Sequence, residues 1–123
     1  MTNMCPTVVV SNGRPRLSVG ASGGRLIPSM VGQIVTLMVD HAWSAEDSLA
    51  APRLHTGGDG RLEFEDRLEA ATLQGLGARG FDLVARPWGS LALGGQSPAV
   101  WFDDQARLFG APDPRRHGGA AAL

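Results

Sequence analysis

Residues 19–28 read VGASGGRLIP, and this stretch joins a strand-like run to a helix-like run through two adjacent glycines. Glycine loses more conformational freedom on folding than any other residue, so a glycine pair at an element junction indicates an unusual backbone path. Such a pair has two ordinary uses. It forms a plain tight turn, or it lets backbone N–H groups come close to another group. By themselves the residues favour the plain turn.

The residues before the glycine pair predict a β-hairpin. Residues 6–10 (PTVVV) are apolar and β-branched, and residues 16–19 (RLSV) alternate between polar and apolar. Between them stand Ser11, Asn12 and Gly13, and Asn-Gly flanked by two such runs is the strongest short-range hairpin signal. We expect two strands that end near Gly20.

The residues after the glycine pair predict two helices. Residues 27–41 (IPSMVGQIVTLMVDH) have apolar side chains at the spacing of a largely buried helix. Ser44 is a good N-cap for a second, short helix, and the acidic Glu46 and Asp47 follow in its first turn, where the helix dipole favours them. Pro52 ends this helix.

The remainder of the chain is richer in strand signals. We expect a third helix at residues 68–78, ended by Gly80, and strands at residues 61–65, 81–85, 91–93, 99–102 and 107–109. The acidic residues Glu63, Glu65, Asp66 and Glu69 are interpreted as a solvated face. Asp103 and Asp104 are interpreted as a turn rather than as a pair of catalytic carboxylates. These elements predict one α+β domain of 123 residues.

Composition excludes several classes of protein. Hydrophobic residues make up 43% and charged residues 19% of the chain, which is typical of a globular protein. The net charge of −1 does not steer the protein toward nucleic acid or an anionic membrane. No apolar run is long enough to span a membrane, and no signal peptide is recognisable at the start. We expect a cytoplasmic protein if the chain is complete.

Metal and cofactor chemistry is not expected either. The single cysteine, Cys5, excludes an internal disulfide and any site built from several cysteines. The three histidines, His41, His55 and His117, are far apart and lack the spacing of metal ligands. The sequence therefore predicts no metal site and no cofactor.

Four segments, taken in order, resemble the gamma-glutamyltransferase family. Residues 2–7 (TNMCPT) and 20–28 (GASGGRLIP) are similar to the family's SSMSPT and GSPGGSRI segments. Residues 44–55 (SAEDSLAAPRLH) resemble its helix followed by A-P-R-x-H, and residues 110–123 (GAPDPRRHGGAAAL) resemble its C-terminal GASDPRRDGAAAGY. Each motif alone is weak, whereas four in the same order from residue 2 to residue 123 are specific.

This resemblance implies a fold and a reaction. The fold is the αββα sandwich of N-terminal-nucleophile hydrolases, of which this chain resembles the C-terminal part of the small subunit. In that family a precursor cuts itself, and the new N-terminal threonine attacks a gamma-glutamyl carbonyl with its own α-amine as the base. The matching threonine would lie upstream of the present residues, so the isolated chain is expected to be inactive. Its partners would be a gamma-glutamyl compound or related amide and the upstream part of the enzyme or a partner subunit.

The resemblance also assigns roles to residues. Gly23 and Gly24 match the glycines of the oxyanion hole, whose backbone N–H groups stabilise the negative charge of the acyl intermediate. Thr2 and Asn3 align with two serines that hold the substrate α-carboxylate, and both replacements can donate hydrogen bonds. Asn3 also presents an acceptor oxygen to the anion. Because this departs from the family's serine, the resemblance does not imply strict gamma-glutamyl specificity.

The tail and the A-P-R-L-H segment are given structural roles. Arg53 and His55 are interpreted as packing near the pocket. The segment from Asp113 to Arg116 is interpreted as a turn that fixes the tail through arginine hydrogen bonds.

Other interpretations stay open. Removal of Met1 would expose Thr2 as an N-terminal nucleophile, but the family places its nucleophile well upstream of this motif. The chain could also be a non-catalytic interaction or scaffold module that kept the fold, or a small independent α+β domain with a plain glycine turn. Strand edges without neighbours favour association, so a homo-oligomer is a further alternative.

Overall fold

The computed structural model of the chain describes residues 3–90, 92–93 and 95–120, and the chain divides into two compact units. The first unit combines residues 1–51 with residues 95–123, and the second consists of residues 52–94. Both units mix helices with strands, which confirms the predicted mixture of α and β elements. The prediction of one partial domain stays a prediction.

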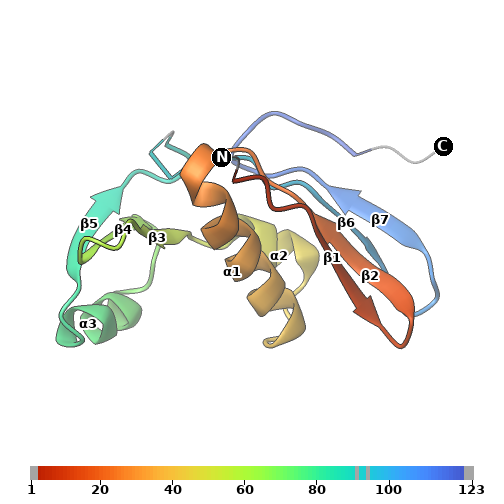
Figure 1. Cartoon of the computed structure of the whole chain (residues 1–123), viewed down its shortest axis with the longest axis horizontal. Helices are drawn as coiled ribbons and strands as arrows, with labels where there is room; N and C mark the ends of the chain where they lie inside the picture. Colours follow the sequence, from red (N-terminus) through yellow and green to blue (C-terminus); the bar gives the residue numbers. More distant parts are fainter. Residues whose placement is uncertain (1–2, 91, 94, 121–123) are drawn as a thin grey trace. The chain divides into compact units, whose positions relative to one another are not determined.

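The first unit is built on a four-stranded antiparallel sheet in the order β1-β2-β6-β7 (Figure 1). Its strands are β1 (Thr7–Ser11), β2 (Arg14–Val19), β6 (Ala99–Phe102) and β7 (Leu108–Ala111). The predicted hairpin is confirmed, because Asn12 and Gly13 both have positive φ, 52° and 74°, as a type I′ turn requires. The strand predicted at 107–109 begins one residue later, at Leu108, and extends to Ala111.

Two α-helices lie on one side of this sheet, and a short 3-10 helix precedes them (Figure 1). They are η1 (Gly24–Leu26), α1 (Ile27–Val39) and α2 (Ala45–Ala50). The predicted cap of α2 is confirmed, since Ser44 Oγ accepts a hydrogen bond from the Asp47 amide at 3.0 Å. The buried core of the unit draws on the helices and on the sheet face that they cover: Leu17, Val19, Leu26, Ile27, Met30, Val31, Ile34, Ala45, Leu49 and Ala99.

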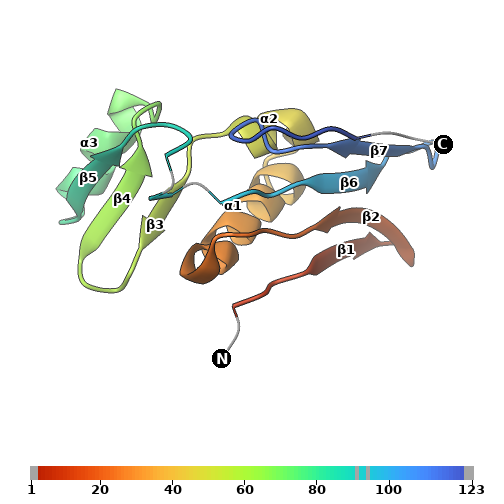
Figure 2. The same cartoon turned by 90° about the horizontal axis from the view of Figure 1, so that it is seen from above.

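The second unit contains the three-stranded sheet β3-β4-β5 and one helix (Figure 2). Its elements are β3 (Leu54–Thr56), β4 (Arg61–Glu65), α3 (Ala70–Ala78) and β5 (Asp82–Arg86). β4 and β5 run parallel, so the chain needs a crossover, and α3 supplies it. Gly80, with φ of 88°, ends the helix as predicted.

Two predictions of secondary structure in this region differ from the structure. The strand β3 was not expected, because three residues are too few to show a period. The strand predicted at residues 91–93 is wrong for Ala92 and Leu93, which lie in a turn, while Leu91 lies outside the described residues. Glycines close by on the C-terminal side favour a turn over an extended strand there.

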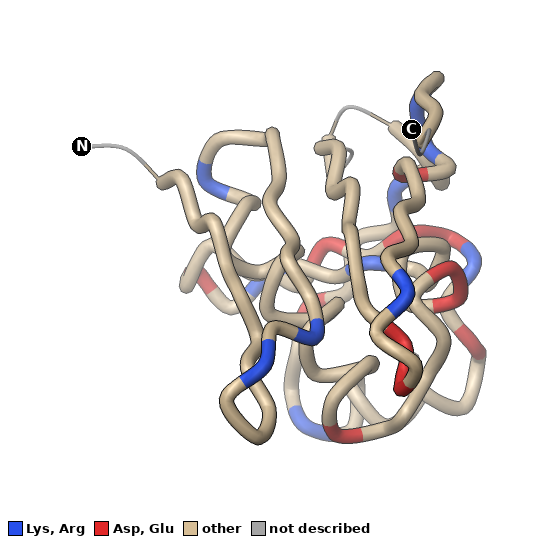
Figure 3. Tube along the Cα trace, turned by 90° about the vertical axis from the view of Figure 1, so that its right-hand side faces the viewer, with Lys and Arg blue, Asp and Glu red and all other residues tan. Residues whose placement is uncertain are grey.

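Charged residues of both signs are spread along the chain (Figure 3). The turn between β6 and β7 is an example of their local pairing. Asp103 accepts hydrogen bonds from the backbone amides of Gln105 and Arg107, each at 2.9 Å, and pairs with the Arg107 guanidinium at 2.7 Å. Asp104 pairs instead with Arg16 at 2.7 Å. The interpretation of the two aspartates as a turn is confirmed.

The Asp103 turn makes a prediction about pH. The backbone amide of Arg107, together with the Arg107 guanidinium and the Gln105 amide, lowers the pKa of Asp103 below its ordinary value of 3.8. Because the pKa is lower in the folded state, the ionised carboxylate stabilises the fold at pH values above the unfolded-state pKa. This contribution to the free energy of unfolding is lost as the pH falls through the folded-state pKa. An NMR titration should give an Asp103 midpoint below 3.8, and Arg107→Gln should raise it. An Arg107→Gln midpoint equal to that of the parent chain would contradict this assignment.

Along the described residues, no helix has the length and apolar character needed to cross a membrane.

Candidate functional site

The glycine pair adopts a backbone path that other residues rarely follow. Gly23 has φ of 143° and Gly24 has φ of 59°, and both lie at the exposed end of the first unit, between β2 and α1. A Cβ atom at position 23 would lie 2.9 Å from Met30 Cε and 3.2 Å from Gly95 Cα. Position 23 therefore requires glycine for two reasons, its conformation and the close packing below it.

The carbonyl groups of the two glycines are used by the start of the helix. The Leu26 amide donates to Gly23 O at 3.2 Å, and the Ile27 amide donates to Gly24 O. Within the described part of the chain, no recorded hydrogen bond uses the amide hydrogen of Gly23 or of Gly24. Two adjacent amide donors thus remain available at the N-terminal end of a helix, where the helix dipole favours negative charge.

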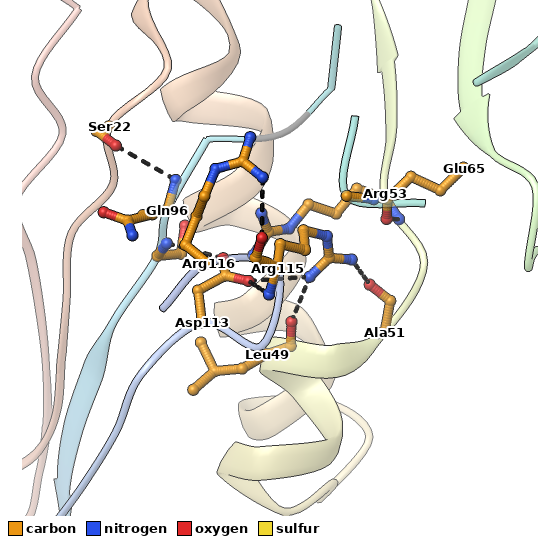
Figure 4. A network of polar contacts seen from close by, with 11 residues as sticks. Ser22, Leu49, Ala51, Arg53, Glu65, Gln96, Asp113, Arg115 and Arg116 are labelled. Carbon is orange, nitrogen blue, oxygen red and sulfur yellow. Dashed lines mark hydrogen bonds and ion pairs between the residues drawn. The ribbon is translucent and has the colours of Figure 1, made fainter. Parts of the chain in front are cut away.

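Residues from a distant part of the sequence hold the glycine loop (Figure 4). The Ser22 amide donates to Gln96 O at 2.8 Å, and the Gln96 amide donates to Ser22 O at 3.1 Å. The Gln96 amide also approaches Ser22 Oγ at 3.3 Å. Sequence reasoning missed this pairing, because Ser22 and Gln96 are 74 positions apart in the sequence.

The tail is anchored by a buried carboxylate next to that segment (Figure 4). Asp113 accepts hydrogen bonds from the amides of Ser97 at 2.9 Å and Arg115 at 3.0 Å. The Arg115 guanidinium donates to the carbonyl oxygens of Leu49 at 2.7 Å and Ala51 at 2.6 Å, at the C-terminal end of α2. The predicted fixing of the tail by arginine is confirmed, and the dipole of α2 favours the cation at this end.

The two residues predicted to bind the substrate carboxylate lie at the start of the chain. Thr2 lies outside the described residues, and Asn3 is exposed. β1 and β2 are antiparallel with Thr7 opposite Val19, so the residues before β1 and the loop after β2 leave the sheet at the same end. The topology therefore brings Asn3 and the glycine loop to one end of the first unit.

A cavity of about 770 Å³ lies beside the glycine loop in the first unit. It begins at Gly20 and Gln96, follows Val100 and Gly110 on the sheet, and reaches the tail at residues 117–120. Neither glycine of the loop lines this cavity. The wall of this cavity therefore contains neither of the two amide donors.

One predicted surface residue is buried. Glu65 is 0% exposed, so its assignment to a solvated face is wrong. Its carboxylate accepts hydrogen bonds from the amides of Arg53 at 2.8 Å and Gly89 at 3.1 Å. Glu65 ends β4 where two loops of the second unit converge. A carboxylate can be buried when backbone N–H donors replace its hydrogen bonds to water.

The histidines do not form a metal site in the described part of the chain. His41 and His117 are exposed, and His55 is half-buried in β3. No group of three potential ligand residues of the kinds His, Cys, Asp and Glu comes together among the described residues. Asp113 and Glu65 are instead bound to backbone amides.

Comparisons with known proteins give one consistent result. The sequence profile described as Gamma-glutamyltranspeptidase matches residues 1–123. The chain is 34% identical to the acylase ACY 1 proenzyme of Pseudomonas sp. (strain SE83) over 123 residues, covering 99% of the chain and 21% of that protein. It is 29% identical to the glutathione hydrolase proenzyme of Escherichia coli (strain K12) over 116 residues, covering 94% of the chain and 19% of that protein.

Solved structures agree with these sequence matches. A gamma-glutamyltranspeptidase from Pseudomonas nitroreducens superposes with a TM-score of 0.84 at 24% identity, covering 100% of the chain and 63% of that chain. A cephalosporin acylase from Bacillus halodurans superposes with a TM-score of 0.83 at 23% identity, covering 93% of the chain and 21% of that chain. At these identities the likeness concerns the fold.

Proposed function

Because the chain belongs to the gamma-glutamyltranspeptidase family, we propose that it supplies the oxyanion hole of an enzyme that transfers or hydrolyses an acyl group. The chain spans about a fifth of the length of the curated relatives it matches, so the rest of such an enzyme would come from other residues. The observation that carries the proposal is the pair of available amide donors at Gly23 and Gly24.

The reaction needs such donors at one step. A hydroxyl oxygen from the upstream part of the enzyme would attack the amide carbonyl carbon, and the carbonyl π electrons would move to oxygen. The resulting oxyanion is stabilised best by donors that are already in position before the reaction. A base of the upstream part would take the proton of the attacking hydroxyl. When the tetrahedral intermediate collapses, the C–N bond breaks and the departing nitrogen receives that proton from the base. Acyl transfer to an amine or to water would complete the cycle.

We assign the substrate carboxylate to the N-terminal residues. Thr2 and Asn3 would bind it through a hydroxyl and an amide N–H donor, and Asn3 leaves the sheet at the same end of the unit as the glycine loop. The amide oxygen of Asn3 accepts hydrogen bonds and so suits a carboxylate less strictly than a serine hydroxyl does. The substrate would therefore be a gamma-glutamyl compound or a related amide. The names of the relatives, glutathione hydrolase and acylase, cover both classes.

The upstream part of the enzyme would cover the open face of the four-stranded sheet. Val8, Val100 and Leu108 lie on the face opposite the helices and are 59%, 45% and 59% exposed. A second sheet packed on this face would complete the αββα sandwich that the family's fold implies. The relatives carry about four-fifths of their length outside the matched segment, which is ample chain for this purpose.

The test removes one amide donor without adding a side chain. In the complete enzyme, glycolic acid in place of Gly24 turns its amide into an ester, and turnover of a chromogenic gamma-glutamyl anilide is measured. We expect kcat to fall about 100- to 1,000-fold, the typical effect of losing one oxyanion donor. We prefer position 24 to position 23, because Gly23 is packed against Gly95 and Met30 and a change there is more apt to disturb folding.

The matched control is the same ester at Gly13. That residue also has positive φ and open space around it, but it lies in the hairpin turn at the other end of β2. Its kcat should equal that of the parent enzyme. Equal kcat for all three proteins would overturn the proposal in favour of a non-catalytic module. Robust turnover by this chain alone would overturn the assignment of the nucleophile to the upstream part of the enzyme.

A further inference from the structure

Gly95 is packed against the glycine loop more tightly than any side chain would allow. It is buried, and an added Cβ atom would overlap the carbonyl oxygen of Ser22 and lie 2.5 Å from Met30 Cε. The overlap with Ser22 involves backbone, which cannot turn away as a flexible side chain can. Any residue other than glycine at position 95 would therefore push the Ser22–Gly23 peptide outward.

The contact is reciprocal and is closed by hydrogen bonds. Gly23 faces Gly95 Cα and Met30 Cε in turn, so the two glycines and the methionine methyl group fill one space. The two backbone hydrogen bonds between Ser22 and Gln96, at 2.8 and 3.1 Å, fix the height of the loop above this space. The next residue, Ser97, donates to buried Asp113, which anchors the supporting segment to the tail.

We propose that Gly95 is a positioning residue for acyl transfer, acting through the Ser22–Gly23 peptide on the direction of the amide donors. This inference rests on the proposed function of Gly23 and Gly24. Oxyanion donors act only within about 2.7–3.1 Å of the developing charge. A displacement of about 1 Å at a reacting group can lower the rate about 100-fold. A Cβ atom at position 95 forces a shift of that size.

The experiment uses Gly95→Ala in the complete enzyme, with kcat expressed per titrated active site and the same gamma-glutamyl anilide as the probe. We expect kcat to fall about 100-fold while KM stays within about twofold. A boronic acid analogue of the substrate, which forms a tetrahedral anionic adduct, should lose affinity in parallel with kcat. A merely structural role would lower the number of active sites and leave both values per site unchanged.

A matched control and a milder variant accompany it. Gly32→Ala adds the same methyl group on the exposed side of α1, where no atom lies within 4 Å, and should leave kcat unchanged. Ser22→Ala removes only the Oγ contact to the Gln96 amide and tests the same device if Gly95→Ala does not fold. We expect it to lower kcat several-fold.

The outcomes separate this inference from the proposed function. If the ester at residue 24 lowers kcat while Gly95→Ala and Ser22→Ala leave kcat and boronate affinity per site unchanged, the positioning role is overturned and the oxyanion assignment stands. If the ester at residue 24 has no effect, the proposed function fails first. Parallel losses in the ester and in Gly95→Ala support both.

Discussion

Replacing Asp113 by alanine is expected to lower the free energy of unfolding of the chain by about 3–5 kcal/mol, the usual effect of breaking a buried ion pair. The Asp113 and Arg115 side chains are 1% and 0% exposed. The substitution removes the acceptor of the Ser97 and Arg115 amides and leaves the guanidinium buried without its carboxylate. Chemical denaturation gives the energy, and hydrogen exchange at the Ser97 amide locates the defect.

Asp103→Ala is a closely matched control for this prediction. Asp103 also accepts two backbone amide hydrogen bonds and pairs with an arginine, but it does so at the exposed turn between β6 and β7. The two variants therefore lose the same kinds of bond and differ in burial. We expect a much smaller loss of stability for Asp103→Ala, because water replaces the lost partners there. Equal losses would mean that burial does not strengthen the Asp113 interactions.

Replacing Glu65 by methionine should destabilise the second unit by about 2–5 kcal/mol, because the buried amide of Arg53 and the half-buried amide of Gly89 lose their acceptor. Methionine has a similar length and no charge, so the packing around the side chain is largely kept. The amides of Arg53 and Gly89 would be left without the carboxylate that they now share. Hydrogen exchange at these two amides should accelerate together, and the denaturation midpoint should fall.

The control for Glu65 is its neighbour Asp66. Asp66 Oδ1 accepts a hydrogen bond from the Trp88 amide at 3.0 Å, in the same loop that Glu65 contacts, but its side chain is exposed. Asp66→Asn should change stability by less than about 1 kcal/mol, as is usual for surface substitutions. A Glu65→Met protein as stable as Asp66→Asn would show that the buried carboxylate contributes nothing.

The sequence predicted the elements whose signals are local. Asn12-Gly13 selects a type I′ turn within four residues, and Ser44 caps α2 through an amide three residues away. The start of α1 at Ile27 follows from its apolar period. The family could be identified because its motifs are short runs of neighbouring residues. The role of Gly23 and Gly24 in catalysis is still a prediction.

The supporting parts of the candidate site could not be predicted in the same way. Ser22 and Gln96 lie 74 residues apart, and the composition of neither segment predicts a contact with the other. Glu65 is the last residue of the alternating run in β4, and alternation alone assigns it to the polar face of the strand. Its burial depends on the loop at Gly89, which returns to β4 only after a helix and another strand.

The amino-acid sequence by itself determined the hairpin, the Ser44 cap of α2, the glycine pair and the family, because turns, caps and short motifs depend on residues within a few positions of one another. Only the tertiary structure decided that Gly95 lies beneath Gly23 and that Asp113 and Glu65 are buried. Burial and close backbone approach depend on which distant segments meet. The packing of the whole unit determines which distant segments meet, and these contacts have no signature in the local sequence.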